Sequence, residues 1–98
     1  MLFIVRFSDK PDTQSIRQAY LPAHLAWLDQ HQASVLVGGS LRAEPEGSAL
    51  GGLWIVEAPD KASVQELIDT DPFWTQGLRA GCEILHWSKA FPDRRALV

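Results

Sequence analysis

Short apolar runs and longer amphipathic segments alternate along this chain in an order that only a few folds accommodate. The apolar runs have the length of strands and are bounded by clusters of Gly, Pro, Asp and Ser. The amphipathic segments have the apolar spacing of helices. The pattern predicts strands and helices in turn, with strands over residues 2–7, 34–42, 52–58 and 82–91 and helices over residues 13–32 and 60–70.

The order of these elements is β-α-β-β-α-β, the split βαβ pattern of a ferredoxin-like α+β fold with its helices on one face of the sheet. Two helices cover only one face of such a sheet. Residues 2–7 and 52–58 are nevertheless apolar at successive positions, which is typical of strands covered on both faces. We therefore predict a homodimer in which two sheets face each other around a partly apolar cavity.

The first predicted helix holds the most informative histidine. It begins at a cap, Asp12 or Thr13, and Pro22 either kinks it or starts a second helix. One broad apolar face is predicted from the helical period, and its members are Ile16, Tyr20, Leu21, Ala23, Trp27 and Leu28. His24 falls near the middle of that face, so we expect a buried imidazole.

Two other segments carry local signals. The pair Gly38-Gly39 interrupts an apolar strand, which indicates either a β-bulge or a place where another group approaches the backbone closely. Asp60 is a good cap for the second helix. After that helix, Asp71 and Pro72 open a short turn that Gly77 closes.

Composition excludes several classes of function. The 98 residues are 46% hydrophobic and 21% charged, as in an ordinary globular domain. A net charge of -3 without a Lys/Arg stripe argues against nucleic acid as a partner. Cys82 is the only cysteine, so no internal disulfide is available. No run approaches the roughly 20 apolar residues of a membrane helix, and no secretion signal is evident, so we expect no membrane partner and a cytoplasmic location.

The sequence lacks the common catalytic motifs. The chain has no glycine-rich phosphate loop and no serine-hydrolase elbow. His24 and His31 are seven residues apart and share a helix face, but no further side chain completes a set of metal ligands. We therefore expect no metal or organic cofactor.

Two short motifs resemble those of the YCII family. Residues 21–28 (LPAHLAWL) resemble its first motif, in which a histidine follows a Pro-Ala pair. Residues 69–73 (DTDPF) resemble its second motif, an Asp-Pro-aromatic step after the second helix. Element order and length also agree, so the resemblance extends to Phe91. We accordingly predict one YCII-like domain over residues 1–91 and a C-terminal tail over residues 92–98.

The resemblance implies a dimeric α+β barrel with a His-Asp pair in a pocket, here His24 and Asp71, proposed as an active site. One branch of the family removes chloride from a chlorinated hydroxyquinol, and fold neighbours isomerise lactones. Proton transfer on a small oxygenated ring is common to both, which suggests an acid–base catalyst of the lyase or isomerase type. A carboxylate on one imidazole nitrogen fixes the tautomer and frees the other nitrogen to move a proton near neutral pH.

Simpler interpretations stand beside these. A histidine on an apolar helix face is commonly a hydrogen-bonded core residue. Asp71 before Pro72 is typical of a helix cap, although a capping carboxylate has a second oxygen to offer His24. Gly39 and Ser40 either line the pocket and bind substrate or belong to a plain bulge. No role is assigned to His31 or His86.

Three functions therefore remain open at this level. The first is a small enzyme that uses the pair His24–Asp71. The second is a non-catalytic dimeric domain that binds a small molecule or serves as an accessory subunit through the same cavity. The third is a purely structural domain in which the two residues form a buried hydrogen bond.

Overall fold

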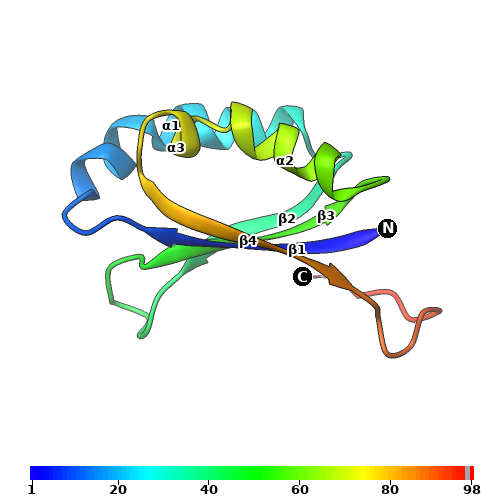
Figure 1. The fold of residues 1–98 in the computed structure, drawn as a ribbon. Coiled ribbons are helices and arrows are strands. Elements are labelled where there is room, and N and C mark those ends of the chain that lie inside the picture. Colours follow the sequence, from blue (N-terminus) through cyan, green and yellow to red (C-terminus); the bar gives the residue numbers. More distant parts are fainter. Residues whose placement is uncertain (97) are drawn as a thin grey trace.

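The four strands form one antiparallel sheet in the spatial order β2-β3-β1-β4. The computed structural model describes residues 1–96 and Val98 (Figure 1). In chain order the elements are β1 (Leu2–Asp9), α1 (Gln14–Gln30), β2 (Val35–Leu41), β3 (Gly51–Glu57), α2 (Lys61–Thr70), α3 (Pro72–Thr75) and β4 (Arg79–Trp87). Because β3 lies between β1 and β2, the chain has the predicted split βαβ arrangement. The ferredoxin-like α+β fold is confirmed.

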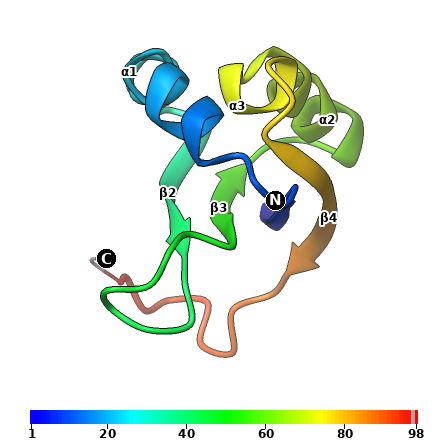
Figure 2. The same cartoon turned by 90° about the vertical axis from the view of Figure 1, so that its left-hand side faces the viewer.

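All three helices lie on one face of the sheet (Figure 1). Figure 2 shows α1 on the side of β2 and the other two helices on the side of β4. Alternate residues of the central strands point into the layer between sheet and helices. The core that results contains Phe3, Val5, Phe7, Trp54, Val56, Val64 and Ile68, each at most 2% exposed. Burying such a side chain stabilises the fold by about 1.5–3 kcal/mol.

Helix α1 runs from Gln14 to Gln30 with Pro22 inside it, so the prediction of a second helix that starts at Pro22 is wrong. Thr13 is its N-cap residue, but the Thr13 hydroxyl donates to the Lys10 carbonyl instead of accepting from the helix. Only His24 and Trp27 of the helix are buried. The prediction of a broad buried face was therefore wrong for three residues. Tyr20, Leu21 and Ala23 are exposed. The helix lies near the β2 edge of the sheet, so only a narrow stripe faces the core (Figure 2).

The last strand lies earlier in the sequence than predicted, since residues 82–91 were expected to form it. β4 begins at Arg79 and ends at Trp87, not at Phe91. The reason is the length of its partner, since β1 begins at Leu2 and that residue already pairs with Trp87. Beyond Trp87 no β1 residue is left to continue the ladder. At the other end, Arg79 pairs with Asp9 across a register shift, which brings this arginine into the sheet.

At the glycines of β2, neighbouring side chains approach the backbone closely, and the strand has no bulge there. The register shift falls between Val35 and Val37, while Gly38 pairs with Trp54 in register. A Cβ on Gly38 would lie 3.2 Å from Cδ1 of Trp54 and 3.3 Å from Cδ2 of Leu28. Glycine at this position lets α1 and the Trp54 ring pack closely on the strand.

The second face of the sheet has no helix over it. Its apolar side chains are half-exposed, for example Leu85 at 45% and Trp87 at 42%. The C-terminal segment passes beneath this face from the end of β4 towards β2 (Figures 1 and 2). A cavity of about 580 Å³ lies between them, lined by Ile55, Trp87 and residues of the C-terminal segment. None of the helices in the described part of the chain combines the length and the apolarity that crossing a membrane takes.

Candidate active site

His24 and Asp71 meet beneath the helices, although they are 47 residues apart in the chain. Nδ1 of His24 lies 2.6 Å from Oδ1 of Asp71, and the residues are 7% and 0% exposed. An ionised carboxylate only accepts hydrogen bonds, so the imidazole donates through Nδ1. In the neutral ring the lone pair then resides on Nε2.

The sequence around Asp71 explains its position. α2 ends at Thr70, and Asp71 becomes the N-cap of α3 with Pro72 at the first helical position. Oδ1 of Asp71 accepts from the backbone N–H of Phe73 at 3.3 Å as well as from His24. The cap and the contact with His24 thus use the same oxygen, whereas two different oxygens were expected. Oδ2 is buried with no partner among the described residues.

Phe73 packs against one face of the His24 imidazole. Its ring stacks on that of His24 with centroids 3.9 Å apart and planes inclined by 14°. Since Phe73 is 1% exposed and its backbone is bound by Asp71, the stacking ring cannot easily move. His24 is therefore fixed by a hydrogen bond at one nitrogen and by an aromatic face.

A cleft of about 260 Å³ opens beside this pair. α1 supplies one wall with His24 among its residues, and β2 supplies another with Gly39 and Ser40. The structure thus brings together His24, Gly39 and Ser40, and it places Asp71 directly behind the imidazole. A Cβ on Gly39 would meet no atom within 4 Å. Because successive Cβ atoms alternate along a strand and that of Gly38 would face α1, this open space lies on the other face of the sheet, and Gly39 lines the cleft through its backbone.

A second buried polar group adjoins the cleft, and the sequence reasoning missed it. Nη1 of Arg79 donates to Oδ1 of Asp9 at 2.7 Å, and Nη2 of Arg17 donates to Oδ2 at 2.5 Å. Burial lowers the pKa of the Arg79 guanidinium from its ordinary value, and the hydrogen bond to Asp9 opposes that shift. Neither Asp9 nor Arg79 falls within a predicted strand or helix, so nothing in the pattern paired them.

The remaining candidate residues lie elsewhere. His31 stacks on Trp27 and bonds its carbonyl oxygen through Nδ1 at 2.7 Å. His86 is exposed on the helix side of β4, with its ring centroid 4.6 Å from that of Phe3. Cys82 is half-buried in β4, and burial raises the pKa of its thiol. Within residues 1–96 and 98, no three His, Cys, Asp or Glu side chains are grouped as a metal ion would require.

Fold and site together define a ferredoxin-like α+β domain with a His-Asp pair at a small cleft. The YCII-related domain matches residues 1–88, and the chain belongs to that family. The chain is 30% identical to 5-chloro-2-hydroxyhydroquinone dehydrochlorinase (TftG) from Burkholderia phenoliruptrix AC1100, solved in complex with 2,5-dihydroxybenzoquinone. That match has a TM-score of 0.81 and covers 90% of this chain and 94% of the other.

Two more distant structures share the fold alone. A putative antibiotic biosynthesis monooxygenase from Bacteriodes thetaiotaomicron VPI-5482 is 20% identical, with a TM-score of 0.59 over 99% of this chain and 95% of that one. An uncharacterized NIPSNAP domain protein from Burkholderia xenovorans is 15% identical, with a TM-score of 0.50 over 93% and 97%. No curated protein matches this chain significantly.

Proposed function

We propose that this protein is a small enzyme that performs general acid–base chemistry on a small oxygenated ring. His24 carries the proton and Asp71 orients the imidazole. The observation that carries the proposal is the buried hydrogen bond between Nδ1 of His24 and Oδ1 of Asp71 in the wall of a cleft. It leaves Nε2 as the nitrogen that faces a ligand.

The size of the cleft supports a substrate of one ring. Its volume is about 260 Å³, whereas a cavity of about 150 Å³ holds benzene. A six-membered ring with a few oxygen substituents therefore fits. TftG, at 30% identity, is named for the removal of chloride from such a ring and was solved with a related quinone.

The chemistry follows from the pair. Nε2 of His24 takes a proton from a ring carbon or hydroxyl, and the imidazolium that forms is stabilised by the carboxylate of Asp71. The same proton can return to another atom of the ring, which isomerises it or prepares the loss of a leaving group. The burial of both residues strengthens the interaction between imidazolium and carboxylate. This scheme needs no metal or organic cofactor.

Gly39 and Ser40 are the proposed substrate-binding residues. Both line the cleft opposite His24. β2 is an edge strand, so alternate backbone groups on its outer side have no partner strand. In this proposal, the Ser40 hydroxyl, which accepts from Arg42 and still has its own proton to donate, bonds a ring oxygen together with the backbone of Gly39.

We further propose that the protein is a homodimer whose sheets face each other. The face of the sheet without helices carries half-exposed Leu85 and Trp87 beside the half-buried Ile4 and Ile55. A continuous apolar surface of this kind is typical of an interface. A monomer at micromolar concentration by light scattering would contradict this.

The test of the catalytic proposal is turnover by His24→Gln. The first assay is chloride release from 5-chloro-2-hydroxyhydroquinone, followed by a panel of hydroxylated rings. We expect a loss of about 10²- to 10⁴-fold in kcat, the usual contribution of a general acid or base. His86→Gln is the matched control, since that histidine lies outside the cleft, and it should keep full activity.

Two outcomes would reject the enzyme. Unchanged turnover in His24→Gln would show that the imidazole does not carry the proton. Ligand binding by the wild type without any turnover, retained in His24→Gln, would instead identify a binding module. If no ligand binds and His24→Leu changes only the stability, the pair is structural.

A further inference from the structure

The cleft that His24 lines is strongly basic for this acidic chain. Its lining includes three of the six arginines in the sequence, Arg17, Arg42 and Arg79, and no carboxylate. The chain as a whole carries a net charge of -3. The positive charge is therefore concentrated at one place, and that place is the candidate active site.

The side chain of Arg79 has a hydrogen-bond donor that no described residue accepts from. This side chain is 3% exposed, and Nη1 donates to Asp9. Nε is buried with no partner among the described residues. The missing side chain of Gly52 makes room for the guanidinium, because a Cβ there would lie 3.1 Å from Nη2 of Arg79. Buried donors of a charged group normally have acceptors, so an unpaired one points to an acceptor that arrives with a ligand.

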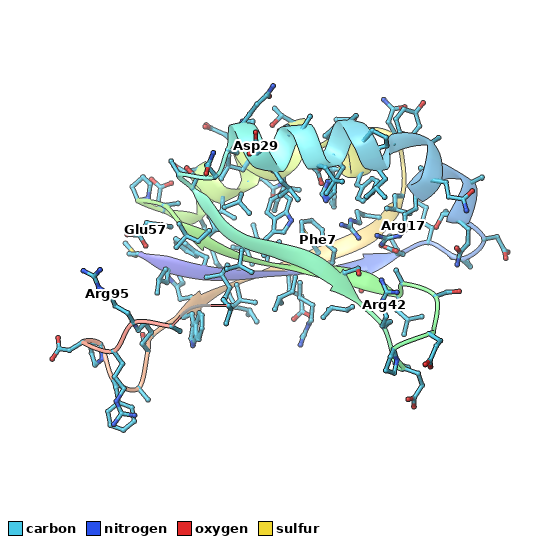
Figure 3. All side chains as sticks on the ribbon, turned by 180° about the vertical axis from the view of Figure 1, so that it is seen from behind. Phe7, Arg17, Asp29, Arg42, Glu57 and Arg95 are labelled. Carbon is cyan, nitrogen blue, oxygen red and sulfur yellow. The ribbon has the colours of Figure 1, made fainter. Side chains whose placement is uncertain are left out.

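The charges around the cleft do not balance. Arg17 and Arg79 both contact the carboxylate of Asp9, and the Asp71 carboxylate also attracts Arg79. With Arg42, three guanidinium groups therefore lie near two carboxylates. Arg42 bonds the uncharged Ser40 hydroxyl through Nη2 at 2.5 Å. Figure 3 shows Arg17 and Arg42 at the same end of the molecule, one between α1 and the sheet and the other at the end of β2. An anion in the cleft would compensate this excess.

The arginines and the His24 imidazole surround one aromatic ring. The guanidinium carbons of Arg17 and Arg79 lie 5.2 Å and 5.3 Å from the centroid of Phe73. His24 stacks on the same ring at 3.9 Å. A ligand of one ring is therefore able to contact a guanidinium and the imidazole at once.

We propose that the cleft binds a planar ring that carries an oxyanion, with Arg79 and Arg17 as the groups that recognise the charge and Arg42 at the rim. The oxyanion is either an ionised ring hydroxyl or a carboxylate. The inference rests on the proposed function, because it names the class of substrate on which His24 acts. The cations would also stabilise the negative oxygen that develops when Nε2 removes a ring proton.

The test compares ionised rings with their methylated, uncharged counterparts in calorimetric titrations. One pair is 2,5-dihydroxybenzoquinone, which ionises as a vinylogous acid, and 2,5-dimethoxybenzoquinone. The other pair is 2,5-dihydroxybenzoate and its methyl ester. We expect the wild type to bind at least one ionised ring about 10-fold or more tightly than its neutral partner, as one charge-assisted hydrogen bond would give. The pair with the larger ratio distinguishes a ring oxyanion from a carboxylate.

Three variants assign the recognition to the arginines. Arg17→Gln should reduce the ratio by about 10-fold, and Arg42→Gln by less because its side chain is exposed. The double variant Asp9→Asn/Arg79→Gln removes the more buried cation and its partner anion together. The charge left without its partner is that of Arg17, whose side chain is 19% exposed, and the ratio should again fall. Arg95→Gln is the control, since that arginine lies at the other end of the molecule from Arg17 and Arg42 (Figure 3) and lines a different cavity. It should leave the ratio unchanged.

The proposal is overturned if the wild type binds neither ionised ring, if it binds neutral and ionised rings equally, or if the ratio survives in Arg17→Gln and in the double variant. His24→Gln separates this result from the proposed function, because it should lose turnover and keep the ratio. If instead turnover persists in His24→Gln while Arg17→Gln lowers the ratio, the anion site is upheld and the proposed catalyst is not.

Discussion

Two buried polar groups lie side by side under the helices, and they differ in chemistry. In the pair His24–Asp71 one member is an imidazole, which can both give and take a proton, and one ring nitrogen is left for a ligand. The cluster of Asp9, Arg17 and Arg79 consists of a carboxylate and two guanidinium groups, and the guanidinium of Arg79 is held mainly by its partner carboxylate. The first group is suited to moving a proton, and the second to holding a fixed charge.

The two groups also differ in what their removal costs the fold. Loss of the Asp71 charge leaves no oppositely charged side chain bonded to that position, because the partners of Asp71 are an imidazole and a backbone N–H. Loss of Arg79 leaves the Asp9 carboxylate buried with one cation in place of two. We therefore expect the cluster to govern stability and the pair to govern activity.

The largest stability effect is expected for Arg79→Met. It leaves the buried Asp9 carboxylate with Arg17 as its remaining cation, and breaking a buried ion pair costs about 3 kcal/mol or more. Urea denaturation measures the loss. Arg6→Met is the matched control, because Arg6 pairs with Glu83 at 2.6 Å with both side chains 55% exposed, and exposed pairs contribute about 0–1 kcal/mol. If Arg79→Met and Arg6→Met lost the same unfolding free energy, the buried cluster would contribute no more to stability than the surface pair.

Asp71→Asn should cost less stability and more activity. One oxygen of Asp71 accepts from both the Phe73 N–H and Nδ1 of His24, so the amide can place only one of its two groups there. With the NH₂ group in that place, it donates to Nδ1 of His24, which favours the tautomer with the proton on Nε2 and removes the base from the cleft. The Phe73 N–H then loses its acceptor, and we expect a loss of about 1–2 kcal/mol. The ¹⁵N shifts of the imidazole report the tautomer directly.

Asp69→Asn is the control for that change. Asp69 is the neighbouring exposed carboxylate and accepts from Gln65 at 2.9 Å, away from the imidazole. It should leave both the His24 tautomer and turnover as they are. A His24 ring with the same tautomer in Asp71→Asn as in the wild type would show that the carboxylate does not orient it.

The smallest effect is expected for Asp60→Ala, which removes an exposed cap. The Ser63 backbone N–H bonds Asp60 at 2.8 Å and lowers the pKa of that carboxyl from its ordinary value. A lowered folded-state pKa means that the carboxylate stabilises the fold above its unfolded pKa, and that this contribution disappears as the pH falls through the folded pKa. Wild type and variant should therefore differ in Tm at pH 7 and converge in acid.

Asp60→Asn completes that comparison. Asparagine caps a helix about as well as aspartate, but it does not titrate. The Tm difference between Asp60→Asn and Asp60→Ala should therefore persist in acid. A difference between wild type and Asp60→Ala that does not change with pH would show that the charge of the cap contributes nothing.

Local signals in the sequence were enough for most of the fold and for half of the site. Apolar runs and caps predicted every strand and the two long helices, and Asp60 acts as the predicted cap. The end of β4 was misplaced because a strand ends where its partner ends, which β1 determines. The exposed Leu21 was misjudged because the helical period shows which residues share a face, but not how much of that face meets the sheet.

The sequence by itself determined the order of elements and the two YCII motifs, because each depends on neighbours within a few positions. The resemblance that these motifs carry implied the pair His24–Asp71. Only the tertiary structure decided that one oxygen of Asp71 serves both the cap and the imidazole. It alone brought Arg79 to Asp9, 70 residues earlier in the chain, through the pairing of β4 with β1. Contacts of this kind arise from the register of strands and the packing of helices, and no local pattern records them.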